Sequence, residues 1–262
     1  MFRQRASYLF VVGFLSVADL LSPAAVAQQL LPDSSHSLPS DADLDALLAA
    51  RNWNALESSL IRVSNADDAG RRVNWLRTRL VKGGGLFVAS NFARNLWLIG
   101  ADLKLQDPAN DPRVSAGLIS LYAYELIVID GSKCEDQSAP VNWISRFLTS
   151  HANIFAFLKQ QPQAVKLKLV DGAIAIERNA APLRKDDELI CRGGIQEMRA
   201  GLERGARHQV PTAAGQIGKT VEVTAPLDWT PKFLSPDAYG PVQDRARAGM
   251  RENLLKLMEQ PS

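Results

Sequence analysis

The amino-acid sequence predicts an all-α fold of about eight or nine helices, arranged as antiparallel hairpins or an irregular helical array, with an extended C-terminal arm. Three observations lead to this prediction. Apolar residues recur at helical spacing over most of residues 41–207. Serine, asparagine and aspartate stand where helices would begin, and glycine and proline stand where they would end. The alternation typical of strands is confined to one short stretch, residues 219–225.

Residues 1–27 have the pattern of a secretory signal peptide. Arg3 and Arg5 precede an apolar run from Tyr8 to Leu21, and the segment ends in Ala25-Val26-Ala27, the small-residue pattern of a cleavage site. The apolar run is shorter than the roughly 20 residues that a spanning helix needs. We therefore expect a periplasmic or secreted protein with a cleaved signal peptide and no membrane span in the mature chain.

The remainder divides by composition into four segments. Residues 28–40 are a polar lead-in that we expect to be flexible, and residues 41–207 are a helical domain. Residues 208–240 are an extended, proline-rich arm, and residues 241–262 hold a C-terminal helix that packs on the same domain. The formal net charge of the full chain is +2, which gives no electrostatic reason to expect nucleic acid as a partner.

Helix signals in the first half of the domain are local and specific. Ser40 is a predicted N-cap with Asp43 at the capping-box position, and Asn65 is placed to cap a helix that stops at the glycines of residues 83–85. Asp111 followed by Pro112 predicts the start of the next long helix. That helix is apolar on nearly all faces, which is typical of a helix at the centre of a core.

The second half continues in the same manner. We expect one helix from Pro140 to about Leu158, a second after Pro162, and a third over about residues 186–205. The arm then follows as a strand or strap without an obvious partner, anchored by Trp229 and Phe233. A last helix over about residues 241–260 would place an apolar stripe on the domain, formed by Val242, Ala246, Met250, Leu254 and Leu257.

The chain has two cysteines, Cys134 and Cys191, and an even count in an exported protein predicts a disulfide. In the chain-entropy model, closing a loop of this length stabilises the fold by on the order of 4 kcal/mol. This bond would join the end of the central helix to the start of the predicted helix at residues 186–205. Pairing with another molecule stays open at this point.

Other roles for Cys134 and its acidic neighbours fit less well. A calcium loop counted from Asp130 lacks glycine at its sixth position and has a cysteine where an oxygen ligand is needed. Zinc sites use closely spaced Cys and His ligands, which this chain does not have. A reactive thiol needs a neighbouring base, for which His151 is a candidate only if the fold brings it close. We therefore expect no metal and no cofactor.

Two local resemblances accompany these patterns. The stretch "LDALLAARNWNALESSLIR" resembles a tetratricopeptide or Sel1-type helical hairpin, which implies helical-repeat-like packing but covers only a small part of the chain. The segments "YELIVIDGSKCEDQSAP" and "ELICRGG" resemble uncharacterised secreted bacterial helical proteins. Neither resemblance implies an activity.

Two functional interpretations follow. The first is an exported, non-catalytic binding or scaffold protein of unknown ligand, which uses a groove between helices for a protein or peptide in the periplasm. The second is a cell-wall-acting hydrolase or lytic enzyme with a helix-borne glutamate. The "LESSL" stretch with Glu57 resembles the Glu-Ser pair of lytic transglycosylases, without that family's downstream segments at the expected distance. In this second interpretation Glu57 or Glu125 is the acid and His151 supports it, although His151 on an apolar stripe is more typical of a core histidine.

Overall fold

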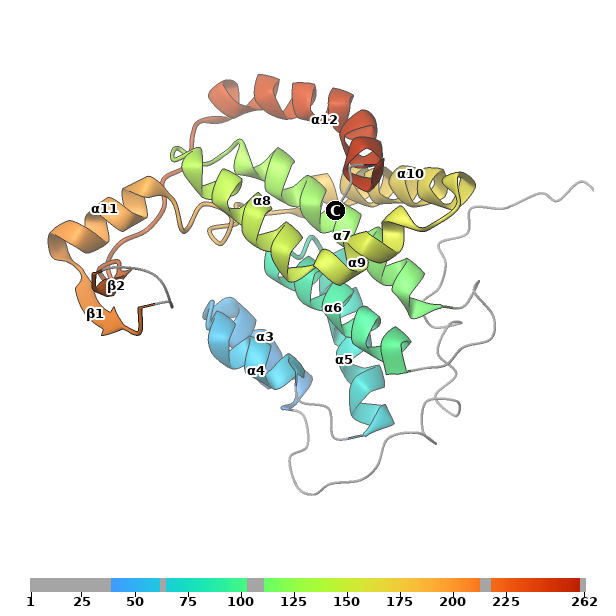
Figure 1. Ribbon diagram of the computed structural model, residues 1–262, viewed down its shortest axis with the longest axis horizontal. Helices are drawn as coiled ribbons and strands as arrows, with labels where there is room; N and C mark the ends of the chain where they lie inside the picture. Colours follow the sequence, from blue (N-terminus) through green and yellow to red (C-terminus); the bar gives the residue numbers. More distant parts are fainter. Residues whose placement is uncertain (1–38, 62–64, 103–110, 213–217, 260–262) are drawn as a thin grey trace, which may run out of the picture.

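The computed structural model describes residues 39–61, 65–102, 111–212 and 218–259. The predicted signal peptide and nearly all of the lead-in lie outside these residues. The described residues confirm the predicted all-α class, since they form ten α-helices, one short 3-10 helix and a two-stranded sheet (Figure 1). The helices up to the short 3-10 helix are α3 (Asp41–Ala49), α4 (Trp53–Ile61), α5 (Ala66–Val81), α6 (Leu86–Asp102), α7 (Pro112–Gly131), α8 (Ser138–Ser150), α9 (Ala152–Lys159) and α10 (Gln163–Ala180).

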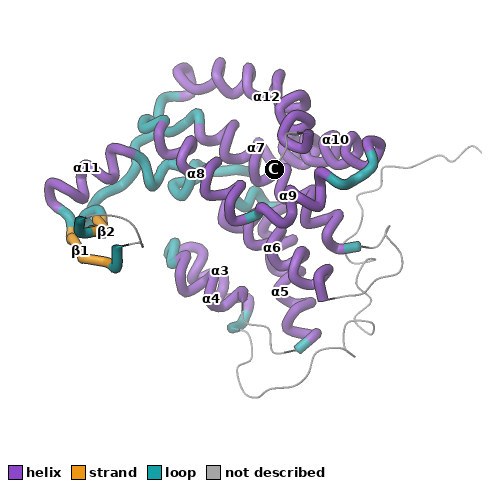
Figure 2. The backbone as a smooth tube through the Cα atoms, viewed as in Figure 1, coloured by secondary structure: helices purple, strands orange, loops and turns teal. Residues whose placement is uncertain are grey.

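The remaining elements are η2 (Ala181–Leu183), α11 (Ile195–Arg204), β1 (Ala206–Val210), β2 (Thr220–Thr224) and α12 (Pro236–Glu259). We call helices α3–α10, η2 and α12 the helical body. Helix α7 is at its centre and packs against α6, α8, α9, α10 and α12. In Figure 1, α12 lies along one side of this body and α11 with the two strands lies at one end. Figure 2 shows that α11 and the strands are connected to the body by loops on either side.

Helix starts agree with the predicted caps. Ser40 and Asp43 form a complete capping box, with the Ser40 hydroxyl accepting from the Asp43 N–H at 3.2 Å. The Asn65 side chain accepts from the Asp68 N–H, and Asp111 accepts from the Arg113 N–H ahead of a proline in the first turn. At the end of α5, Gly83 has a φ of 85°, a left-handed conformation that favours glycine.

Helix α7 is buried as its all-round apolar character predicts. Its length and composition alone would allow it to cross a membrane, but 72% of its most apolar window is buried inside the protein. Leu121, Leu126 and Ile127 on α7 have no exposed surface, and Trp75 of α5 and Leu158 of α9 are equally buried in the same core. Helix α7 is therefore the core helix around which the body is assembled.

Three predicted elements differ in the structure. The helix predicted from Pro140 to Leu158 is broken at His151, which ends α8 and precedes α9. The helix predicted over residues 186–205 begins only at Ile195, because Gly193 has a φ of 81° and Gly194 is extended. Helix α12 buries Gln243, Met250, Leu254 and Met258, whereas Val242 from the predicted stripe is 39% exposed.

The predicted arm is the largest difference. Strand β2 is not alone, because β1 pairs with it antiparallel, with Ala206 opposite Thr224 and Val210 opposite Thr220. Only the residues after β2 form an extended strap, in which Phe233 is partly buried against the core and makes a bridge with Cys134. Phe233 is therefore an anchor as predicted, but residues 206–210 and 220–224 of the predicted arm region form a paired two-stranded sheet.

Candidate functional site

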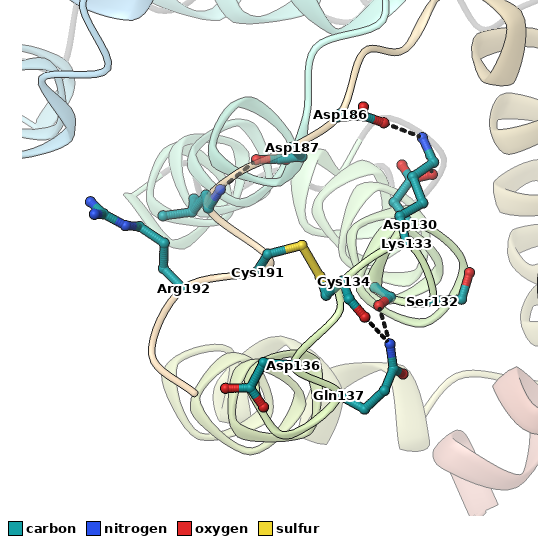
Figure 3. The surroundings of a disulfide bond; sticks show 12 residues. Asp130, Ser132, Lys133, Cys134, Asp136, Gln137, Asp186, Asp187, Cys191 and Arg192 are labelled. Carbon is teal, nitrogen blue, oxygen red and sulfur yellow. Dashed lines mark hydrogen bonds and ion pairs between the residues drawn. A yellow bond between two sulfur atoms is a disulfide. The ribbon is translucent and has the colours of Figure 1, made fainter. Parts of the chain in front are cut away.

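The loop between α7 and α8 holds the two cysteines together. Cys134 of this loop and Cys191, which lies just before α11, have Cα atoms 5.3 Å apart and are at disulfide distance (Figure 3). Both side chains are buried, with relative exposures of 0% and 3%. The disulfide predicted from the sequence joins the same two residues. A buried disulfide is typical of proteins in an oxidising compartment.

Asp136, two residues after Cys134, accepts hydrogen bonds that fix the start of α11. Asp136 accepts hydrogen bonds from the Gln196 N–H at 2.7 Å and the Ser138 N–H at 3.0 Å. The Ser138 hydroxyl in turn accepts from the Ile195 N–H at 2.8 Å. Burial raises the pKa of Asp136, but the hydrogen bonds donated by the Ser138 hydroxyl and by the Gln196 and Ser138 N–H groups outweigh it, so the pKa is lowered. The α7–α8 loop thus caps the first turn of α11.

The chain returns to the same loop after β2. The Glu135 N–H donates to the Lys232 carbonyl at 3.0 Å, and the Leu234 N–H donates to the Lys133 carbonyl at 2.8 Å. On the entering side, the Trp143 indole of α8 donates to the Arg192 carbonyl at 3.0 Å. We call α11, β1 and β2 the α11–hairpin unit. It is attached to the helical body at both ends, beside the disulfide.

The α11–hairpin unit exposes large apolar side chains. Ile195, Met198 and Leu202 recur at the spacing of one helix face, and their relative exposures are 57%, 55% and 45%. Val221 of β2 is also exposed, and Leu227 follows just after the unit. Soluble surfaces carry single exposed apolar residues everywhere, but a stripe of them on one short helix is a sign of an interaction surface.

Helix α11 packs against strand β2. Gly201 lies so close to β2 that a Cβ atom there would come within 2.6 Å of Val223 Cγ1, so α11 packs on the face of the sheet that carries Val223. Side chains two residues apart in a strand share a face, which places Val221 on the same side. The α11–hairpin unit therefore carries exposed apolar side chains on both α11 and β2, where Val221 is 46% exposed.

The strands themselves are poorly covered. Every β1 residue except Val210 is exposed, and the described sheet contains only β1 and β2. Each strand thus has one edge at which no described strand pairs. A two-stranded hairpin is marginally stable alone, and an open edge presents unpaired main-chain donors and acceptors. This surface is the candidate functional site, and its residues were not singled out in the sequence, although the spacing of Ile195, Met198 and Leu202 is visible there.

The predicted catalytic candidates Glu57 and His151 both contact α6. Glu57 of α4 accepts from Arg94 at 2.8 Å, and His151 Nε2 lies 3.3 Å from the Ser90 hydroxyl one turn earlier. The other ring nitrogen, Nδ1, lies 3.1 Å from the Phe147 carbonyl, and the ring stacks on Phe147. Burial lowers the pKa of His151, so the ring is neutral near neutral pH. Both nitrogens have partners inside the protein, as in a core histidine.

The third candidate acid, Glu125, lies elsewhere. It is in the middle of α7 with no exposed surface, whereas Glu57 carries an exposed ion pair. Among the described hydrogen bonds and ion pairs, none joins Glu125 to Glu57 or His151. Within the described part of the chain, no group of three or more His, Cys, Asp or Glu side chains is placed to hold a metal ion. Comparison with protein-family models, curated proteins and solved structures gives no significant match.

Proposed function

We propose that this chain is an exported binding protein without catalysis, and that the α11–hairpin unit binds an extended segment of a partner protein. Export is supported by the pattern of residues 1–27 and by the buried cysteine pair. The observation that carries the binding role is the combination of open strand edges with the exposed stripe of Ile195, Met198 and Leu202.

An extended peptide is the partner whose chemistry matches this surface. Its main chain supplies the donors and acceptors that an open strand edge lacks, which is the mode of β-strand addition. Its alternate side chains can pack on the apolar stripe beside the strands. The charges of the unit are of both signs, with Arg204 and Arg207 near Glu203 and Glu222, so nothing favours a nucleic acid or an anionic lipid surface.

The attachment of the unit to the body supports the proposal. A binding surface must be presented in a fixed orientation, and the disulfide, the Asp136 cap and the Lys133–Leu234 hydrogen bond fix both connections. The large helical body would then serve as the scaffold. This differs from the groove between helical hairpins that the sequence led us to expect as the binding surface.

Selection from a phage-displayed library of random linear peptides on the immobilised full chain tests the proposal. We expect selected peptides with alternating apolar residues that lose about tenfold or more in affinity for the Met198→Ser/Leu202→Ser variant. The control is Val141→Ser, which removes an exposed apolar side chain from α8, outside the proposed binding surface. Selected peptides that bind the double variant as well as the wild type would contradict the proposal.

The oligomeric state separates this proposal from self-association. Light scattering after size exclusion should give a monomer for both the wild type and the double variant. A wild-type dimer that the Met198→Ser/Leu202→Ser change dissociates would mean that a second copy, and not a partner peptide, covers the surface.

A further inference from the structure

Glu125 is buried in the core without a hydrogen-bond partner. Its side chain has no exposed surface, and neither Oε1 nor Oε2 accepts a hydrogen bond from any described residue. A carboxylate in such a place loses its hydration without compensation, which strongly disfavours the charged form. A neutral carboxylic acid loses far less. The geometry therefore favours the protonated form of Glu125.

The charge of Glu177 adds to this preference for the protonated form, whereas Arg184 and Arg178 oppose it. Glu177 of α10 is buried as well, and it accepts from Arg184 at 2.7 Å and from Arg247 of α12 at 3.2 Å. Arg184 also pairs with Asp130 of α7 at 2.7 Å. Arg184, which acts on Glu125, is thus already shared by two other carboxylates. Ionising Glu125 would place a further buried negative charge beside Glu177.

The ionisable groups around Glu125 come from several elements. Glu177 and Arg178 of α10 and Arg184 after η2 act on it directly. Tyr122, one turn earlier on α7, has a buried hydroxyl that faces the same Arg184, Asp130 and Glu177 charges. Arg247 of α12 reaches the cluster through Glu177. Helices α7, α10 and α12 therefore meet at one buried ionic cluster, in which the carboxyl group of Glu125 has no hydrogen-bond partner among the described residues.

We propose that Glu125 makes the contact between α7 and α10 sensitive to pH: α10 is held firmly on α7 while Glu125 is protonated, and deprotonation of Glu125 loosens that contact. This inference is independent of the binding role of the α11–hairpin unit. The consequence is a core that tightens in acid and opens more often as the pH rises. For an exported protein, the pH that matters is that of the compartment outside the cytoplasm.

The direction and range of the effect follow from the protonation states. Burial, followed by the charge of Glu177, raises the pKa of Glu125 to about 8, against an ordinary value of 4.5. Between these values the closed form holds one proton more than the opened form. The stabilisation is therefore complete below about pH 4.5 and is lost as the pH rises to about 8, with a tenfold change in the opening constant per pH unit.

Hydrogen exchange of the full chain at two pH values tests the proposal. Between about pH 5.5 and about pH 7.5, the protection factors of the α10 amides should fall by up to about a hundredfold in the wild type. In Glu125→Gln, which keeps the size and polarity but cannot ionise, this fall should be absent. Glu57→Gln is the control, because that glutamate is half-exposed and should leave the wild-type behaviour unchanged. An equal fall in the wild type and Glu125→Gln would overturn the proposal.

A second measurement uses only the wild-type chain and therefore does not depend on whether a variant folds. With carbon-13 placed only in glutamate side-chain carboxyl groups, Asp187, whose pKa burial also raises, gives no signal. One glutamate resonance should titrate near pH 8 in the native wild-type chain. If all glutamate resonances titrate within about one unit of the ordinary value, Glu125 is ionised at neutral pH and the proposal fails.

Discussion

The helical body and the α11–hairpin unit differ in how far they bury the same kinds of apolar side chains. In the body, Met250 and Leu254 of α12 are buried in the hydrophobic core, and even the side chain of the charged Arg184 is enclosed. In the unit, Met198 and Leu202 face solvent, and the strands have open edges. The difference teaches that apolar side chains in this chain serve stability where the helices enclose them and are available for recognition where two strands and one helix leave them exposed.

The two regions meet at one loop. The α7–α8 loop carries Cys134 and Asp136, and it holds both connections of the α11–hairpin unit. The disulfide and hydrogen bonds of this loop thus fix the position of a unit whose strands are largely exposed. Three substitutions, taken from the largest expected effect to the smallest, can break or sharpen this comparison.

The largest effect is expected in the buried ionic cluster of the body. Arg184→Met would leave Asp130 and Glu177 buried without their shared cation, and we expect a loss of about 3–5 kcal/mol in the free energy of unfolding. Urea denaturation measures this loss. Arg251→Met is the matched control, because its ion pair with Asp171 is exposed and should contribute no more than about 1 kcal/mol. Similar losses in the two variants would mean that burial does not distinguish these ion pairs.

Removing the disulfide should have an intermediate effect. The variant Cys134→Ala/Cys191→Ala is expected to lose about 2–4 kcal/mol, because its unfolded chain is no longer constrained over a sequence separation of 57 residues. Hydrogen exchange should show the loss first in α11 and in the strap around Phe233. The account would be weakened if exchange changed only in α5 and α6, far along the chain from the bond.

The smallest effect is expected on the exposed stripe. Met198→Gln should change the free energy of unfolding by no more than about 0.5 kcal/mol, because that side chain already faces water. The same change at Met250, which is 2% exposed in the body, should cost several times as much, because a buried amide is left without partners. Thermal unfolding of the two variants makes the comparison. Equal costs would show that Met198 is held in a core and is not available for binding.

Local signals account for what the sequence predicted well. Helix starts at Ser40, Asn65 and Asp111 depend on side chains within three residues of the cap, so they can be recognised without knowing the fold. The central position of α7 follows from its apolar surface on all sides. The cysteine pair follows from an even count and from the signal-like start of the chain.

The structure differs from the sequence-based expectations where the local fold depends on residues far away in the sequence. Strand β1, with the sequence ARHQV, has no clear alternation, and it becomes a strand because β2 pairs with it. The late start of α11 depends on Gly193, whose left-handed backbone precedes a helix capped by Asp136 from another part of the chain. Glu125 was visible as an acid on a helix, but its burial beside Glu177 depends on how α7 and α10 pack.

The most direct test of the central claim is hydrogen exchange with and without a selected peptide. The account predicts that saturating peptide raises the protection of amides in β1 or β2 and in the first turns of α11, while amides in α7 and α10 are unchanged. That result would place recognition in the α11–hairpin unit and scaffolding in the body. Protection that appears only among the helices of the body, with none in the strands, would contradict the account.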